Sequence, residues 1–205
     1  MKKLVFVLVC VGLLSCQSRE EKIADLIKKE MFKTLYDFES YEPIETSKLD
    51  SAYTTIYQDP IIRGRAIEII ATMEIGNKYI KECEEHVRTI EIWGDSYTTR
   101  ARNKVNEARE ELSKSVAVLE KIVQTVAAAQ KVIKEESEKF VPSFMGWSVI
   151  HEFRCKTKGG NFDIGKYKYV FTPKLDEILY TIDLNSESET EIRSKIDEAL
   201  AEKKE

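Results

Sequence analysis

The stretch IIRGRAIEIIATMEIGNKYIKECEEHVRTI, residues 61–90, decides the fold of this chain. Its apolar and small residues recur at alternating steps of four and three, the heptad spacing with which one side of a helix packs against another helix. These positions are Ile62, Ala66, Ile69, Met73, Gly76, Ile80, Cys83, Val87 and Ile90. The pattern predicts a long helix with a seam along these residues.

A second stretch with the same spacing follows the turn signal Gly94-Asp95. Its seam positions are Ala101, Val105, Ala108, Leu112, Ser115, Leu119, Ile122, Val126, Ala129 and Ile133. A short connection forces two such helices to run antiparallel. With a rise of 1.5 Å per residue, the arms span roughly 45 Å and 60 Å. We therefore expect residues 59–141 to form a coiled-coil-like helical hairpin.

The segments on either side of the hairpin predict a small α+β domain. Helical spacing of apolar residues over about 20–36 indicates a first helix, and Pro43 indicates an edge strand at residues 40–46. After Pro142 the pattern alternates with period two, which is typical of antiparallel strands, and strands are expected at 147–156, 167–171 and 177–184. A capping box at Ser188 and Glu191 predicts a C-terminal helix.

The fold class is therefore α+β, with the hairpin inserted in a small domain made of a helix and an antiparallel sheet. The expected domain comprises residues 22–58 together with 142–205, and it includes the C-terminal helix.

The first fifteen residues have the features of an export signal. Lys2 and Lys3 precede an apolar run that ends at Leu14, and this run is too short to span a bilayer, for which about 20 residues are needed. The sequence Leu13-Leu14-Ser15-Cys16 resembles the lipobox of bacterial lipoproteins, which implies cleavage before Cys16 and attachment of lipid to it. Residues 1–15 are then a signal peptide and 16–21 a tether. The alternative is an ordinary secretory signal with a coincidental cysteine.

The lipobox resemblance predicts where the protein lives. A lipid on Cys16 implies attachment to a membrane of the bacterial cell envelope, and we expect an outer-membrane lipoprotein. Periplasmic and cell-surface placement both remain open.

Charge argues against one class of partner. The chain has 32 basic and 36 acidic residues, and loss of residues 1–15, which include Lys2 and Lys3 but no acid, leaves 30 and 36. Nucleic acid favours basic surfaces. We therefore expect no nucleic-acid partner.

Two segments outside the hairpin resemble a group of exported proteins. Tyr41-Glu42-Pro43-Ile44 and the later His151-x-x-Arg154-Cys155-Lys156 are similar to segments of lipoproteins of the Bacteroidetes whose function is unknown. The resemblance implies a helix packed on a small antiparallel sheet, with the hairpin as an insertion. It implies no catalytic residue.

Residues with catalytic or metal-binding potential are few. Of the two histidines, His151 alternates with apolar residues and is predicted to be a buried structural histidine, while Glu82 and His86 share a helix face that is best explained as charged surface. Cys83 and Cys155 are left for a disulfide, which sequence does not decide. Motifs for a nucleophile elbow, a phosphate loop or a zinc site are absent from the sequence. We expect no enzyme activity, no cofactor and no metal.

The remaining candidate site is the predicted sheet. Aromatic and basic side chains gather on its strands and give a possible face for a ligand or partner. Its residues are Arg154, Lys156, Lys166, Lys168, Tyr167 and Tyr169. The leading hypothesis is a protein-interaction module that uses its hairpin, and the alternative is a small-ligand or glycan-binding lipoprotein that uses this sheet face.

Overall fold

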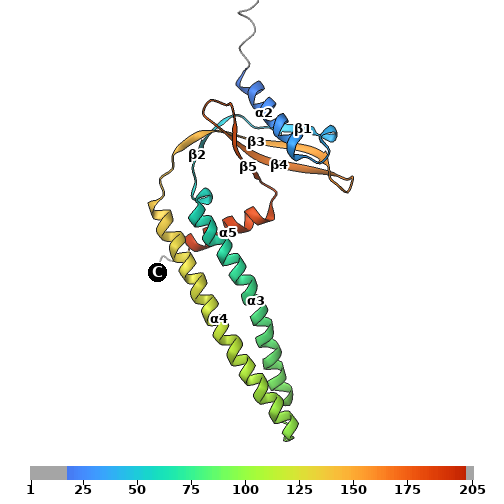
Figure 1. The fold of residues 1–205 in the computed structure, drawn as a ribbon, viewed down its shortest axis with the longest axis vertical. Coiled ribbons are helices and arrows are strands. Elements are labelled where there is room, and N and C mark those ends of the chain that lie inside the picture. The colour runs from blue at the N-terminus through green and yellow to red at the C-terminus, as the bar shows by residue number, and fades with distance from the viewer. Residues whose placement is uncertain (1–17, 202–205) are drawn as a thin grey trace, which may run out of the picture. The chain divides into compact units, whose positions relative to one another are not determined.

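The computed structural model describes residues 18–201, which form two compact units (Figure 1). The first unit contains residues 18–54 and 142–186, and the second contains residues 55–141 and 187–201. The first unit carries a five-stranded antiparallel sheet and the second is helical. The predicted α+β class is confirmed. The signal peptide and Cys16 lie outside the described residues.

The first helix of the sheet unit, α2 (Arg19–Thr34), begins within the segment expected to be a tether. The hydroxyl of Ser18 accepts from the backbone N–H of Glu21, and the Glu21 carboxylate accepts from the backbone N–H of Ser18. This capping box satisfies free N–H groups at the helix start. The expected tether, 16–21, therefore overlaps the helix from Arg19 onward.

The sheet is built around one long strand. Its strands are β1 (Glu42–Thr46), β2 (Asp50–Tyr53), β3 (Phe144–Lys156), β4 (Phe162–Phe171) and β5 (Ile178–Asp183). β1 and β2 pair with successive parts of β3, and β4 and β5 continue on the other side, so the path is β1-β3-β4-β5. Helix α2 covers one face. The buried core between helix and sheet consists of Ile23, Ile27, Met31, Val149, Phe153, Tyr169, Phe171 and Leu175.

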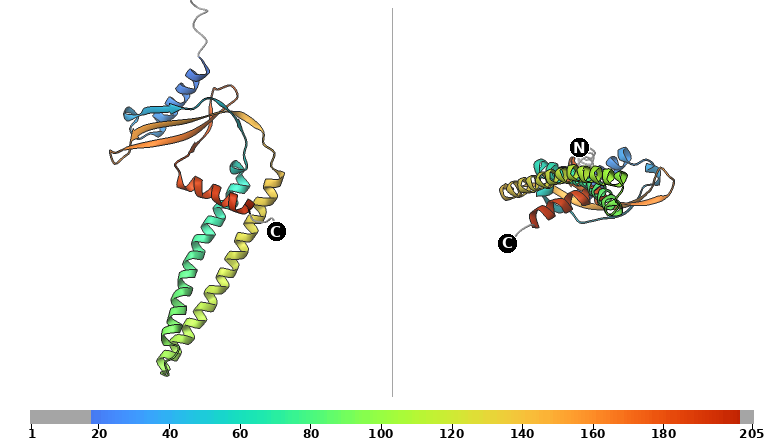
Figure 2. Two further views of the ribbon diagram at one scale, coloured as in Figure 1. Left: turned by 180° about the vertical axis from the view of Figure 1, so that it is seen from behind. Right: turned by 90° about the horizontal axis from the view of Figure 1, so that it is seen from below.

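The helical unit contains the predicted hairpin. Helices α3 (Pro60–Trp93) and α4 (Thr99–Lys139) run antiparallel and lie side by side (Figure 2). Asp59 caps α3 by accepting from the N–H groups of Ile61 and Ile62, and Pro60 occupies the first turn, where its missing N–H costs nothing. Every predicted seam residue of α4 is buried or half-buried. The second seam is confirmed.

The seam of α3 is only partly as predicted. Ile62, Ala66, Ile69 and Gly76 are buried. In contrast, Met73, Ile80 and Val87 are 41%, 47% and 41% exposed. A seam can be closed by the residue three or four positions after each core residue. The half-buried residues along this part of α3 include the predicted Cys83 and Ile90, and also Thr72, Tyr79 and His86, which lie three positions after Ile69, Gly76 and Cys83. The residues four positions after these three, Met73, Ile80 and Val87, are turned outward, and their predicted burial is wrong.

The C-terminal helix α5 (Glu187–Ala201) packs on the hairpin. Its buried residues Ile192, Ile196 and Ala199 share a core with residues of α3 and α4, which include Ile62 and Ile133. This differs from the expected domain boundary, which grouped residues 142–205 with the sheet. An amphipathic helix shows that one side is buried but not which surface buries it.

A bidentate ion pair fixes α5 to the start of α3. The two guanidinium nitrogens of Arg63 lie 3.0 Å and 2.6 Å from the Glu189 carboxylate oxygens. The Arg63 side chain lowers the pKa of Glu189 by this hydrogen bonding. The paired geometry orients α5 as well as attaching it.

Candidate functional site

His151 lies at the centre of the sheet face that α2 covers. The alternation of β3 turns His151 to the same side as Val149 and Phe153, and its side chain is only 2% exposed. Its ring is nearly parallel to that of Phe153, with centroids 5.8 Å apart. The prediction of a buried histidine is confirmed.

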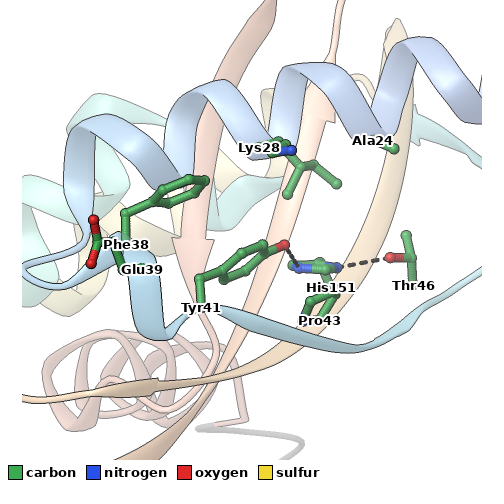
Figure 3. Close-up of a pocket in the computed structure, with 9 residues that line it drawn as sticks. Ala24, Lys28, Phe38, Glu39, Tyr41, Pro43, Thr46 and His151 are labelled. Atoms are coloured by element: carbon green, nitrogen blue, oxygen red, sulfur yellow. Dashed lines mark hydrogen bonds between the residues drawn. The ribbon is translucent and has the colours of Figure 1, made fainter.

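Both ring nitrogens of His151 are engaged by residues that bracket β1. The Tyr41 hydroxyl lies 2.7 Å from Nε2, and the Thr46 hydroxyl lies 2.8 Å from Nδ1 (Figure 3). A buried polar nitrogen without a partner would cost about 1–3 kcal/mol. The two hydroxyls remove this cost and hold β1 against β3.

A β-bulge makes this arrangement possible. In a regular strand, residues 41 and 46 would point to opposite faces, because side chains alternate. The pairing of β1 with β3 shifts by one residue between Pro43 and Glu45. The extra residue brings both Tyr41 and Thr46 to the side of His151.

The environment keeps this cluster uncharged. Burial lowers the pKa of His151, although a backbone hydrogen bond with Glu45 opposes this, and burial raises the pKa of Tyr41. Both groups are therefore neutral. One ring nitrogen of His151 donates to a hydroxyl and the other accepts from one, and the tautomer of the ring decides which.

A pocket of about 520 Å³ opens beside this cluster, between α2 and β1 (Figure 3). Its walls are Ala24, Ile27, Lys28, Phe38, Glu39, Tyr41, Pro43, Thr46 and His151. The lining is mostly apolar with a few polar groups, as is usual for small-molecule sites. The Tyr41 hydroxyl supplies a polar group, and Lys28 and Glu39 supply charges of opposite sign. Such a pocket suits a small molecule with an apolar part and a polar group.

The six residues of the predicted sheet site do not form one surface. Tyr167 pairs with His151 and Tyr169 with Val149, so both lie on the face that α2 covers, and Tyr169 is fully buried. The basic residues lie on the opposite face of the same two strands. They are Arg154, Lys156, Lys166 and Lys168.

The basic face is partly neutralised by neighbouring acids. Arg154 lies 3.5 Å from Glu42, and Lys166 lies 3.3 Å from Glu152. The guanidinium of Arg154 also stacks 4.1 Å above the Phe162 ring. Arg154 and Lys166 therefore form ion pairs with acids of neighbouring strands on this face of the sheet.

A second candidate site lies along one side of the hairpin. We call it the hairpin face, and it consists of Met73, Ile80 and Val87 on α3 with Val116 and Val123 on α4, beside the half-buried seam residue Leu119. Val116 and Val123 are 42% and 66% exposed. The α4 residues line a shallow groove of about 400 Å³ together with Glu120 and Gln124.

The remaining candidate chemistry is sparse within the described chain. Cys83 and Cys155 are free thiols, and burial raises the pKa of Cys155, which keeps it protonated. Among residues 18–201, no group of three acidic, His or Cys side chains is placed to hold a metal ion. No helix in this range is long and apolar enough to cross a membrane.

Comparison with known proteins adds no relative to this description. No protein-family model matches the chain, no curated protein matches it, and no solved structure matches it.

Titration of His151 gives the first prediction. We expect the free energy of unfolding of the sheet unit to decrease as the pH falls below 6.5, the ordinary pKa of histidine. Burial lowers the pKa of His151 in the folded chain, so below pH 6.5 the unfolded chain binds the proton more readily, and stability is lost until the folded pKa is reached. Urea unfolding in a Trp93→Phe background, followed by Trp147 fluorescence between pH 8 and 5, measures this.

The control uses the other histidine. His151→Gln should remove this part of the pH dependence, and His86→Gln should retain it. Equal pH profiles for His151→Gln and the parent chain would contradict the assignment.

Proposed function

We propose that the protein is a lipid-anchored protein of the bacterial cell envelope whose hairpin binds other proteins through the hairpin face. The observation that carries the proposal is that many buried positions between the helices hold small residues, while larger aliphatic residues are exposed beside them. Small residues alternate with larger ones, such as Leu112 and Ile122, in the middle and tip of the seam between the helices, while exposed aliphatic residues line the hairpin face. The small seam residues are Gly76, Cys83, Ala101, Ala108 and Ser115.

The hairpin face favours a protein partner because of its spacing. Met73, Ile80 and Val87 are seven residues apart and lie in one row of α3. A row of aliphatic residues at heptad spacing is the surface with which a helix packs against further helices. At about 25 cal/mol per Å², covering these side chains would stabilise a complex considerably.

Lipid anchoring is supported by the N-terminal sequence. The basic residues, the short apolar run and Cys16 match a lipoprotein signal, and two or more acyl chains would give stable attachment. We place the protein in the outer membrane on this basis, on its periplasmic side or at the cell surface.

The anchor has a direct test. Cys16→Ser should abolish lipid attachment, because serine at this position accepts no lipid. Labelling with a palmitate analogue, detected on the immunoprecipitated protein, measures this loss. Cys10→Ser, a change within the apolar run, is the control and should keep the label. Label on Cys16→Ser would contradict lipid attachment at Cys16.

The interaction surface is tested by crosslinking in cells. A photo-crosslinking amino acid at position 80 should give specific adducts with proteins of higher mass, several-fold more abundant than those from position 75. Ile75 is the matched control, since it is the same residue type on the same helix, is 54% exposed, and lies on the other side of α3. Equal adduct patterns at the two positions would count against the hairpin face.

A second candidate function, small-ligand binding, is favoured by the pocket beside His151. Its apolar walls, the Tyr41 hydroxyl and the opposite charges of Lys28 and Glu39 would suit a monosaccharide, or a short carboxylate that pairs with Lys28.

The pocket is tested by filling it. Within a panel of short-chain carboxylates and monosaccharides, we expect at least one compound to raise the melting temperature of the protein. Ala24→Trp should abolish that rise, because an indole at position 24 occupies the pocket, whereas Lys22→Trp on the same helix should not. A panel without effect on the parent chain, or an equal rise in Ala24→Trp, would dismiss this function.

A further inference from the structure

We propose that the hairpin face docks a second copy of this chain, so that two hairpins form a four-helix bundle. The inference rests on the proposed function and names its partner. It follows from the geometry of the hairpin face, from the area it offers and from the charges beside it.

The residues of the hairpin face come together because the helices are antiparallel. A Cβ atom built at Gly76 would lie 3.4 Å from Cγ2 of Ile122, which places these two seam positions opposite each other. Ile80 follows Gly76 by four positions and Val123 follows Ile122 by one, so both are rotated from the seam in the same sense. A two-fold axis normal to the plane of an antiparallel pair exchanges the helices and keeps each side of that plane. Both rows therefore lie on one side.

The other side of the hairpin carries more charge, although Ile75 is an exposed aliphatic residue there. The residues preceding the seam positions in α3 and α4 include Glu82, Glu107, Lys114 and Lys121. Lys114 lies 2.8 Å from both Glu110 and Glu111, within a solvated charge cluster. One apolar side opposite a more charged side gives a closed pair of hairpins rather than an open chain of them.

The hairpin face is large enough for a dimer only together with the charged positions that continue it toward the tip. This longer surface, two helices or about 20 Å wide and roughly 36 Å long from Ile70 to Trp93, covers about 700 Å² in each copy. Two copies would bury about 1,400 Å², within the range of roughly 1,200–2,000 Å² of specific interfaces.

Charges at the border of the hairpin face favour a second copy and define its orientation. Toward the tip, Glu84 and Glu91 occupy the outer row of α3, next to Lys81 and Arg88, while Arg102 and Arg109 continue the row of Val116 and Val123 on α4. The two acids and the two arginines are exposed, and Arg102 also donates to the Tyr97 carbonyl at 3.2 Å. A two-fold axis along the hairpin would place α3 of one copy on α4 of the other with the tips together. The acidic row of each copy then meets the basic row of its partner.

The first experiment measures the oligomeric state of the full-length chain in non-ionic detergent by sedimentation velocity. We expect a dimer at micromolar concentration. Ile80→Lys should raise the dissociation constant at least about tenfold, because it places an ammonium in an apolar interface, while circular dichroism shows unchanged helicity. Ile75→Lys, on the more charged side, should leave the dimer intact.

The second experiment tests the pairing of the charged rows. Glu84→Arg with Glu91→Arg makes both rows basic, and Arg102→Glu with Arg109→Glu makes both acidic. Each double variant alone should dissociate, and an equimolar mixture should form a heterodimer, since each basic row then meets an acidic one. This rescue between chains cannot arise from effects inside one hairpin. A mixture that stays monomeric, or double variants that dimerise as the parent does, would overturn the proposed orientation.

The outcomes separate this inference from the proposed function. A parent chain that remains monomeric at high micromolar concentration overturns docking of a second copy. If position 80 of that monomer still crosslinks to another envelope protein and position 75 does not, the interaction function stands with a different partner. If neither position crosslinks, both proposals fail.

Discussion

The fold depends on a pair of hydrogen bonds that joins two residues far apart in the sequence. The backbone N–H of Thr54 donates to the Ser143 carbonyl at 2.8 Å, and the backbone N–H of Ser143 donates to the Thr54 hydroxyl at 2.8 Å. They extend the ladder between β2 and β3, in which Tyr53 pairs with Phe144. The chain between Thr54 and Ser143 must therefore start and end at the same place, the end of the β2–β3 ladder. A long helical insertion can do so only as an antiparallel pair, which makes the hairpin a consequence of strand pairing as well as of its own heptads.

Closing the insertion at its base leaves the far part of the hairpin to stabilise itself. Near the base, α5 adds Ile192 and Ile196 to a core with Ile62 and Ile133. Farther out, small seam residues such as Gly76 and Ser115 bury little apolar area, so the half-buried Leu112 and Ile122 supply most of it. Several other aliphatic side chains are directed to the hairpin face instead. The placing of small residues in the seam and of aliphatic residues beside it therefore explains the exposed apolar surface of the hairpin.

The sequence predicts the helices of this hairpin well and their contacts only in part. The seam of α4 is confirmed because most of its large apolar residues lie in one stripe, with Val116 and Val123 as exceptions. In α3 apolar residues extend over a wider arc. After Ile69 the seam can continue through Thr72 or through Met73, and both choices keep the heptad period. Local periodicity does not distinguish the two, since the choice depends on where α4 lies. The same reasoning applies to α5, whose apolar stripe predicts burial but does not name the surface that provides it.

The cluster around His151 shows a different limit. Alternation along β3 is enough to predict that His151 is buried, because a period of two assigns each residue to a face. The same rule separates Tyr167 from Lys166 and Lys168, so the two sides of the predicted sheet site could have been told apart. The partners of His151 could not. Tyr41 and Thr46 are an odd number of residues apart, and only the bulge after Pro43 brings both to the same face. Since a bulge is defined by the register with the partner strand, one inserted residue decides both the hydrogen bonds of His151 and the side chains that line the pocket.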